Sequence, residues 1–363
     1  MIPIARPYIG EEEIAAVSDV MRLGVLANGS VVTEFEKRFA KYCGCKYAVG
    51  TNSGTSALHA ALLCTGIKPG DEVIVPSFTF IATATSVSMC GAKPVIVDVE
   101  DEYFTIDPDR ILENITDKTK AVIGVHLFGQ PFDLRAVLEI CEDKNIFLIE
   151  DCAQAHGSLY QGQKVGSFGL SGCFSFYPTK NMTTGEGGIV TTSESSYDER
   201  LRRVVNHGQS EKYLHTELGF NLRMSNIDAA IGNVQLSKLD WMNERRCENA
   251  NILSKGIDAE GIKKPVIRPG CSHVYHQYVI CLEEDYKLSR DELMQKLNEK
   301  GIGCAVHYPM PVHKQPLYLS SGNYRYECPV SERLSESVLS LPVHPGVTTE
   351  DCEYICKVIN GAD

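Results

Sequence analysis

The sequence predicts an α/β fold in which a large domain, with a mostly parallel central sheet between helices, is followed by a smaller α+β domain. Short apolar runs alternate with helical patterns through the first part of the chain, and each run is apolar at consecutive positions. Strands that are apolar on both faces belong to parallel sheets covered by helices on both sides. After a long helical pattern the sequence pattern changes to separate strands and charged helices, which is typical of an α+β unit.

The expected elements of the large domain follow one another as strand, crossover helix and strand. The segments that predict strands are 46–51, 72–76, 93–99, 120–129, 145–151, 172–178 and 187–193. Helical patterns cover 53–66 and 131–145, and the first ends at Gly66 as a C-terminal cap would. A turn-rich link joins the last two strands.

A helix from Ser225 to Lys255 is expected to lead out of the large domain. The elements expected after it are a strand at 278–282, a helix at 289–301, a strand at 304–309, and helices near 329–341 and 348–360. We therefore expect a large domain with an N-terminal arm over residues 1–240. A small domain would cover residues 241–363.

The charge balance argues against nucleic acid or a membrane as a partner. The chain has 363 residues, with 35 Lys and Arg against 47 Asp and Glu and a net charge of −12. A nucleic-acid or anionic-membrane surface needs a basic footprint. No apolar run is long enough to span a bilayer, and the N-terminus lacks a basic start followed by an apolar stretch. We therefore expect a cytoplasmic protein.

The 14 cysteines are interpreted as buried free thiols. Many lie inside apolar segments, where a reduced thiol behaves as a small hydrophobic group. Two close pairs, Cys43 with Cys45 and Cys352 with Cys356, have no second pair at zinc-finger spacing. We expect no metal site.

Polar residues follow the first expected strand at the point where a helix begins. Ser53, Gly54 and Thr55 stand there. Gly54 would let the backbone approach an anion, and free N–H groups and hydroxyls at a helix N-terminus would bind its oxygens. The alternative is that Ser and Thr merely cap the helix.

Two other strand ends carry candidate catalytic groups. Asp151 ends an apolar strand, where it needs a positive or N–H partner unless it is exposed or salt-bridged. Ser175 and Lys180 surround the end of the strand expected at 172–178. A lysine there could have a lowered pKa and trap a carbonyl group, although most lysines are solvated.

This order of residues, a Ser-Gly-Thr cradle, a strand-end Asp and then Ser-x4-Lys, resembles fold-type I enzymes that use pyridoxal 5'-phosphate (PLP). The motifs that extend the resemblance are SGTSALHAAL, VIVPSFTFIATA, IEDCAQAHG, FSFYPTKNMTTGEGG, GFNLRMSNIDAAIGNVQL and HYPMPVHKQP. With them the chain is similar to the sugar-nucleotide aminotransferase family called DegT/DnrJ/EryC1/StrS, from about Pro3 to the last expected helix. The resemblance implies the fold-type I aminotransferase fold and PLP as cofactor.

The resemblance implies roles for residues at matching positions. Lys180 matches the lysine that forms a Schiff base with PLP and moves the proton during transamination. Asp151 matches the carboxylate that pairs with the pyridinium nitrogen and keeps the ring an electron sink. Gln154 matches the residue near the phenolic oxygen, and Phe80 matches the aromatic that stacks on the ring.

Further residues are implied for the phosphate and the substrate. Gly54, Thr55 and Ser175 would hold the phosphate, with Ser53 beside them. Asn221 matches an asparagine that reaches the neighbouring subunit's phosphate site, which implies a homodimer with a shared active site; a turn or helix cap is the plain alternative.

The residues assigned to substrate binding are His307, Tyr308, His313 and Arg223. His307 and Tyr308 match residues at the mouth of the substrate site, and His313 belongs to the same motif, although a strand-end His and Tyr can simply pack. Arg223 and Arg22 are candidates for contacting the diphosphate, and solvated arginines are the alternative.

The resemblance implies transamination from an amino acid, L-glutamate with 2-oxoglutarate as product, to a nucleotide-linked keto sugar, for surface polysaccharide or glycan biosynthesis. KNMTTGEGG resembles enzymes that aminate C4, whereas VHYPMPVHKQP resembles enzymes that aminate C3. The 4-keto sugar is slightly favoured. The sequence does not distinguish UDP, GDP or dTDP as the nucleotide.

Three other functions agree less well with the sequence than transamination does. A dehydratase branch of the same family carries a histidine in place of the lysine found here at 180. A non-catalytic regulator on this fold would have lost the lysine or the aspartate. A nicotinamide-dependent dehydrogenase would need G-x-G-x-x-G after the first strand, and the sequence has none there.

Overall fold

The structure is a computed structural model that describes residues 1–320 and 327–361. Within these residues the largest sheet has seven strands in the order β1-β9-β8-β5-β4-β2-β3. The strands are β1 (Tyr47–Thr51), β2 (Glu72–Pro76), β3 (Lys93–Val97), β4 (Thr119–Val125), β5 (Phe147–Asp151), β8 (Ser171–Ser175) and β9 (Gly188–Thr192). β3, β2, β4, β5 and β8 are parallel, whereas β9 runs antiparallel to both β1 and β8. The predicted α/β class with a mainly parallel sheet is confirmed.

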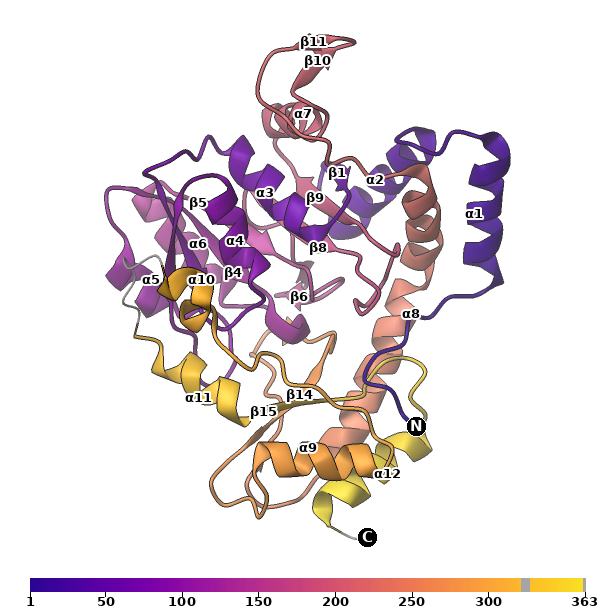
Figure 1. Ribbon diagram of the computed structural model, residues 1–363, viewed down its shortest axis with the longest axis vertical. Coiled ribbons are helices and arrows are strands. Elements are labelled where there is room, and N and C mark those ends of the chain that lie inside the picture. The colour runs from indigo at the N-terminus through magenta and orange to yellow at the C-terminus, as the bar shows by residue number, and fades with distance from the viewer. Residues whose placement is uncertain (321–326, 362–363) are drawn as a thin grey trace.

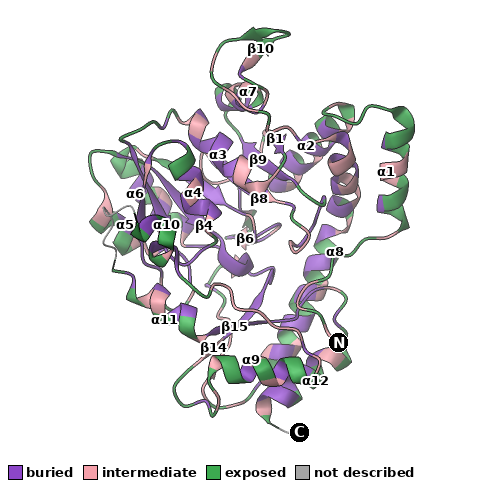
Figure 2. Ribbon diagram, viewed as in Figure 1, coloured by how far each residue is buried: buried purple, intermediate pink, exposed green. Residues whose placement is uncertain are grey.

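Helices cover this sheet and define, together with it, the large domain (Figure 1). They are α2 (Ser30–Cys43), α3 (Gly54–Cys64), α4 (Ala82–Met89), α5 (Pro108–Asn114), α6 (Leu134–Lys144) and α7 (Ser195–Val204). Helix α1 (Glu11–Leu23) lies away from the sheet and packs against α8 (Asn226–Gly256). Alternate residues of one strand enter different core clusters: Ile74 packs in one, and Val73 and Val75 pack in the other. Burial on both faces (Figure 2) is the reason for the continuously apolar runs.

The long helix α8 (Asn226–Gly256) joins the large domain to a small domain. Leu236 and Leu239 pack in the core of the large domain, whereas Ala250 and Leu253 pack in the core of the small domain. The boundary expected after residue 240 therefore falls inside one continuous helix. The main elements of the small domain are β12 (Ile262–Lys263), β14 (Tyr278–Leu282), α9 (Arg290–Glu299), α11 (Pro329–Ser337), β15 (Val338–Leu341) and α12 (Thr349–Asn360).

The N-terminus lies on the small domain, next to elements that are distant in sequence (Figure 1). The backbone N–H of Ile2 donates to the carbonyl of Gly301 over 2.8 Å, and the N–H of Gly303 donates back to Ile2 over 2.8 Å. The first residues are thus tied to the small domain, although the sequence assigned them to the large one.

Shorter elements complete the fold. They are β6 (Leu159–Tyr160), β7 (Gln163–Lys164) and β13 (Cys271–Ser272), the hairpin β10 (Gln209–Glu211) and β11 (Leu214–His215), α10 (Pro316–Leu319), and the 3-10 turns η1 (Leu127–Gly129) and η2 (Val312–Lys314). β6 pairs with both β7 and β13, and the β10–β11 hairpin projects above α7 (Figure 1). No helix in the described part of the chain has both the length and the apolar character needed to cross a membrane.

Two local predictions for the small domain were wrong. Residues 304–309 form no strand; a single backbone bridge joins Ala305 to Ser340. The helix expected near 329–341 ends at Ser337, and the chain continues as β15 because Val338 to Leu341 pair antiparallel with β14 and are fully buried. Pairing between segments far apart in sequence decided both outcomes.

Asp98, just after β3, is expected to anchor α11 to the large domain. Its carboxylate accepts hydrogen bonds from the backbone N–H groups of Val330 and Ser331, both over 2.9 Å, and from the Ser331 hydroxyl over 2.6 Å. Asp98→Ala should lower the free energy of unfolding by about 2–4 kcal/mol, because buried donors lose a charged acceptor. Urea unfolding followed by circular dichroism measures this.

The matched control is Asp101→Ala, three positions along the same loop. Asp101 forms an exposed ion pair with Arg333, and such pairs contribute about 0–1 kcal/mol. Equal losses from the two substitutions would contradict the anchoring role of Asp98.

Candidate active site

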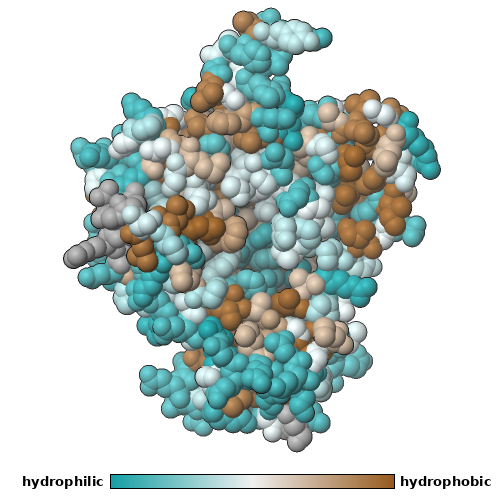
Figure 3. Space-filling model, viewed as in Figure 1, coloured by the Kyte–Doolittle hydropathy of each residue, from teal (hydrophilic) through white to brown (hydrophobic). Residues whose placement is uncertain are grey.

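A cavity of about 410 Å³ lies where the carboxyl ends of the parallel strands face the small domain. Ligands of open parallel sheets bind at this end of the strands. On the face drawn in Figure 3, a recess separates the surfaces of the two domains. The predicted residues that line the cavity are Ser53, Gly54, Thr55, Phe80, Asp151, Gln154, Ser175, Lys180, His307 and Tyr308.

Asp151 ends β5 with its carboxyl group at the wall of the cavity. Oδ2 accepts a hydrogen bond from the hydroxyl of Thr83 over 2.9 Å, and Oδ1 accepts one from the N–H of Ala153 over 3.1 Å. Burial raises the pKa of the Asp151 carboxyl, and these two donors oppose that rise. The arrangement holds an acid in one orientation, facing into the site.

Lys180 follows β8, the strand next to β5, and its side chain lines the same cavity. Burial lowers the pKa of its amine from 10.5 to about 8, while the negative charge of Asp151 acts in the opposite direction. A larger share of the amine is therefore neutral near pH 7 than for a solvated lysine. A neutral amine can attack a carbonyl group or accept a proton.

The N-terminus of α3 and the end of β8 form a narrow cradle. Ser53 caps α3 by accepting a hydrogen bond from the N–H of Ser56 over 3.1 Å. A Cβ on Gly54 would lie 2.6 Å from the Cβ of Ser175, so glycine is required for this close approach. The remaining N–H groups at the helix start, the hydroxyl groups and the helix dipole together suit an anion such as phosphate.

Gln154 links the large domain to the small-domain side of the cavity. Its Oε1 accepts from the backbone N–H of Phe128 over 2.7 Å, and its Nε2 donates to the hydroxyl of Tyr308 over 2.9 Å. Phe80 is 55% exposed on the cavity wall, with its ring centroid 6.1 Å from that of Tyr308. An exposed aromatic face inside a cavity suits a flat ring of a ligand.

His307 lines the cavity, whereas His313, from the same predicted motif, does not. Nδ1 of His307 lies 2.8 Å from Oγ of Ser340, and burial lowers the pKa of its imidazole to about 4. His313 lies 2.6 Å from the Ser77 hydroxyl and 3.0 Å from a Glu332 oxygen. Its contacts therefore tie η2 to two neighbouring segments.

The predicted residues Asn221, Arg223 and Arg22 also lie outside the cavity of a single chain. Asn221 is exposed, and Arg223 donates to the side chain of Asn206. Arg22 is exposed on α1 and pairs with Asp19 over 2.8 Å.

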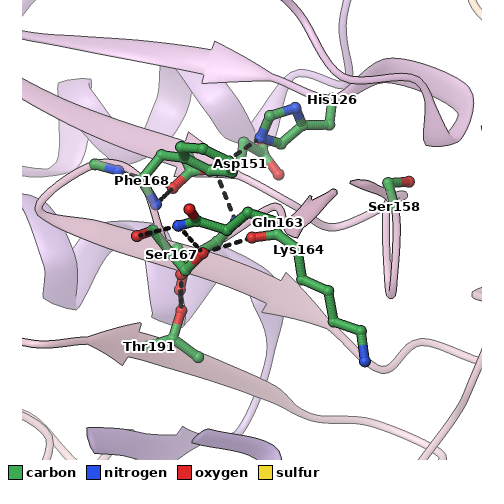
Figure 4. Close-up of polar contacts among 12 residues, drawn as sticks. His126, Asp151, Ser158, Gln163, Lys164, Ser167, Phe168 and Thr191 are labelled. Carbon is green, nitrogen blue, oxygen red and sulfur yellow. Dashed lines mark hydrogen bonds and ion pairs between the residues drawn. The ribbon is translucent and has the colours of Figure 1, made fainter. Parts of the chain in front are cut away.

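Glu150, the other carboxylate at the end of β5, holds neighbouring backbone in place. It is fully buried; its oxygens accept from the backbone N–H groups of Gly166, Phe168 and Gly169 over 2.7–2.9 Å, and one lies 3.1 Å from Nε2 of His126. Figure 4 shows two of these partners, Phe168 and His126, on either side of Asp151. Glu150 thus anchors the loop after β7 and does not line the cavity.

Sequence reasoning missed seven polar residues of the cavity, namely Thr79, Thr83, Tyr177, Thr179, Glu186, His276 and Gln277. Thr83 sits in the small-residue run ATATS, where nothing in the sequence marks its bond to Asp151. His276 and Gln277 lie between β13 and β14, far in sequence from the other motifs. The polar pair that precedes the apolar run YVICL was the available signal.

Comparisons with known proteins agree with this geometry. Residues 7–360 match the DegT/DnrJ/EryC1/StrS aminotransferase family. The dTDP-3-amino-3,4,6-trideoxy-α-D-glucose transaminase of Streptomyces venezuelae is 40% identical over 92% of this chain and 87% of that protein. The UDP-N-acetyl-3-dehydro-α-D-glucosamine 3-aminotransferase of Acidithiobacillus ferrooxidans is 38% identical over 96% of this chain and 93% of that protein.

Solved structures show the same likeness. The crystal structure of S. venezuelae DesV in complex with a ketimine intermediate superposes with a TM-score of 0.93 at 37% identity, covering 99% of this chain and 98% of that one. Solved neighbours also include a PLP form and a PMP form. PLP is the cofactor of the family.

The residues of the cavity fit PLP. The cradle at Gly54, closed to any larger residue by Ser175, suits the phosphate. Asp151 would hold the ring nitrogen, Phe80 would offer an apolar face to the ring, and Lys180 would offer an amine with a lowered pKa to the aldehyde.

The lowered pKa of Lys180 predicts how cofactor-free protein captures PLP. The rate of covalent capture should rise with pH and level off above a midpoint near 8, because the protonated amine is not a nucleophile. Stopped-flow absorbance across a pH series measures the midpoint. A midpoint near the ordinary value of 10.5 would contradict the burial argument. Lys180→Ala, the control, should give no borohydride-stable adduct by peptide mass mapping.

Thr83 is predicted to support turnover through Asp151. Thr83→Val keeps the shape but removes the donor to Oδ2, and turnover should fall about tenfold or more, since a hydrogen bond to a charged group contributes about 1.5–3 kcal/mol. Steady-state kinetics on cofactor-saturated protein measure the loss. Thr85→Val is the control, because Thr85 on the same helix makes a long 3.5 Å bond to the carbonyl of Ala82. Equal turnover rates for the two variants would contradict the role of Thr83 in supporting Asp151.

Proposed function

We propose that this chain, which belongs to the DegT/DnrJ/EryC1/StrS aminotransferase family, transfers the amino group of L-glutamate to a 3-keto sugar linked to a nucleotide. The family, its PLP cofactor and sugar-nucleotide amination as the activity class follow from the comparisons. The observation that carries the proposal is that Lys180 and Asp151 line one cavity beside an anion cradle. The donor, the ketone position and the assembly are the proposed parts.

When bound, PLP supplies an aldehyde carbon that can carry an amino group and a ring that withdraws electrons from it. Nζ of Lys180 removes the proton from the α-carbon of the donor in the first half-reaction. In the second half-reaction the same atom delivers a proton to the sugar carbon. An amine with a pKa of about 8 suits both tasks, because general acid–base catalysis is most efficient when the pKa lies near the working pH.

Asp151 and the cradle hold this chemistry in place. The carboxylate is oriented by the Thr83 hydroxyl and the Ala153 N–H, so that it can keep the ring nitrogen protonated. The N-terminus of α3 fixes the phosphate end. Residues at both ends of the cavity would hold the cofactor in one orientation beside Lys180, so that the same amine could serve both half-reactions.

The proposed ketone position is C3. Two relatives that cover most of this chain are named for 3-amino sugars or 3-amination. The glycine-rich segment after Lys180 slightly favours C4, and this motif is the competing signal.

A homodimer with a shared site is part of the proposal. Asn221 is exposed and lies outside the cavity of its own chain. An exposed residue at a two-fold interface can complete the partner's site.

The residues of the site do not support the two alternative functions within the family, a sugar dehydratase and a non-catalytic regulator. Lys180 is present where the dehydratase branch carries histidine, and both Lys180 and Asp151 line the cavity, which a regulator without catalysis would not require.

The test is a panel reaction with PLP-loaded protein, L-glutamate and paired 3-keto and 4-keto nucleotide sugars. We expect 2-oxoglutarate in equal amount to an aminated product, with the 3-keto substrate favoured at least about tenfold in kcat/KM, which is about 1.4 kcal/mol. Mass spectrometry and enzymatic 2-oxoglutarate assay give both quantities. Preference for the 4-keto substrate would overturn the proposed amination at C3. Absence of 2-oxoglutarate with every acceptor would overturn L-glutamate as the proposed amino donor.

A further inference from the structure

Two adjacent polar side chains of the small domain, His276 and Gln277, are buried in the wall of the cavity that holds Lys180. Their residues are 5% and 6% exposed. Nδ1 of His276 has no hydrogen-bond partner among the described residues. The side-chain amide of Gln277 makes no hydrogen bond within residues 1–320 and 327–361, but it is open to the cavity and is not closed off from water. The backbone N–H of Gln277 donates to the carbonyl of Phe128 over 3.4 Å.

Unpaired polar groups are rare in protein interiors because each loses its hydrogen bonds to water without replacement. A single case can be strain or a hidden water. Nδ1 of His276 is such an atom in a residue that lines a ligand cavity, and the Gln277 amide beside it reaches the same cavity, so a ligand could supply the partner that each lacks. Both residues therefore belong to the part of the site that binds a substrate group.

A buried positive charge lies behind this wall. Arg246 on α8 is 5% exposed, and its guanidinium donates to the carbonyls of Tyr275 and His276 over 3.1 and 3.4 Å. It forms no ion pair with any described residue, and its Nε has no partner there. Lys180 adds a second basic group on the cavity side. Asp151 and Glu186 line the same cavity with negative charge, so the attraction for an anion is confined to the wall that Arg246 backs.

The imidazole itself is neutral. Burial, followed by the charges of Lys180 and Arg246, places the pKa of His276 well below its usual value. A neutral imidazole carries one N–H, and the Gln277 amide carries two. The wall thus offers two neutral donor groups, the His276 imidazole and the Gln277 amide, and the positive charge of Arg246 lies behind them.

This combination suits a carboxylate better than a phosphate. A carboxylate presents two acceptor oxygens and one charge, which two neutral donors in a positive field can satisfy. A diphosphate usually takes cationic side chains in direct contact. The phosphate cradle at Ser53 and Gly54 belongs to a different part of the cavity and is assigned to the cofactor.

We propose that His276 and Gln277 form the subsite that binds a carboxylate of the amino-acid donor. This inference rests on the proposed function, since it assigns a place to the donor in that reaction. In it the two residues bind the carboxylate, and Lys180 moves the proton.

The experiment measures binding of glutarate, which carries the carboxylates but no amine, to PLP-loaded protein by calorimetry. His276→Phe removes both ring nitrogens and keeps an aromatic shape. His276→Asn puts an amide nitrogen near the position of Nδ1. We expect His276→Phe to weaken glutarate binding about tenfold or more, and His276→Asn to stay within about threefold of the unsubstituted protein. In stopped-flow single turnovers the same pattern should appear for L-glutamate.

Two further variants make the test independent of folding. Gln277→Met keeps the length of the side chain without its amide and should also weaken glutarate binding severalfold. His273→Asn is the control: His273 lies in the same segment, stacks on Tyr275 and does not line the cavity, so its affinity should be unchanged. Thermal melts establish which variants are folded.

Equal affinity of His276→Phe and the unsubstituted protein overturns the subsite, as does a His276→Asn variant that binds as weakly as His276→Phe. No glutarate binding to the unsubstituted protein overturns it as well. Failure of the proposed function gives a different result: glutarate binds and depends on His276, yet L-glutamate yields no 2-oxoglutarate with any acceptor.

Discussion

The site depends on one buried carboxylate, that of Asp151, at the end of a central strand. A charge in this position is costly unless donors surround it. The Thr83 hydroxyl supplies one from α4, and the Ala153 N–H supplies another from the turn after β5. Because β5 and β8 are parallel neighbours, their carboxyl ends bring Asp151 and Lys180 to the same cavity. Burial raises the pKa of Asp151 and lowers that of Lys180, and the charge of each group partly opposes the shift of the other.

Much of the large domain could be predicted from sequence because its signals are local. Each buried strand reads as a continuous apolar run, and each run ends where polar residues begin. Since parallel strands place these ends at one edge of the sheet, Ser53, Asp151 and Lys180 could be placed together before any coordinates. Position along the chain made them candidates, because the topology turns sequence order into proximity, and the resemblance to the PLP-dependent family singled them out from their plain alternatives.

The small domain shows where such reasoning fails. Val338 to Leu341 form a strand because β14 offers a partner, and 304–309 form none although their composition suits one. Whether His276 is paired or unpaired depends on what faces it after folding, and no local pattern records that. His313 shows the reverse case: its motif suggested a substrate contact, and its hydrogen bonds to Ser77 and Glu332 became visible only in the folded chain.

An enzyme that binds two unlike substrates in turn needs a cavity wall that suits both of them, and here that wall is formed by His276 and Gln277. A guanidinium in direct contact would favour the carboxylate of an amino acid and would penalise a sugar, whose hydroxyl groups cannot neutralise it. Neutral donors such as an imidazole N–H and an amide can bind either kind of oxygen. Holding Arg246 one layer behind His276 keeps some attraction for an anion while leaving the contact surface uncharged. This layering gives a physical reason for a buried arginine that pairs with backbone carbonyls and with no described acid.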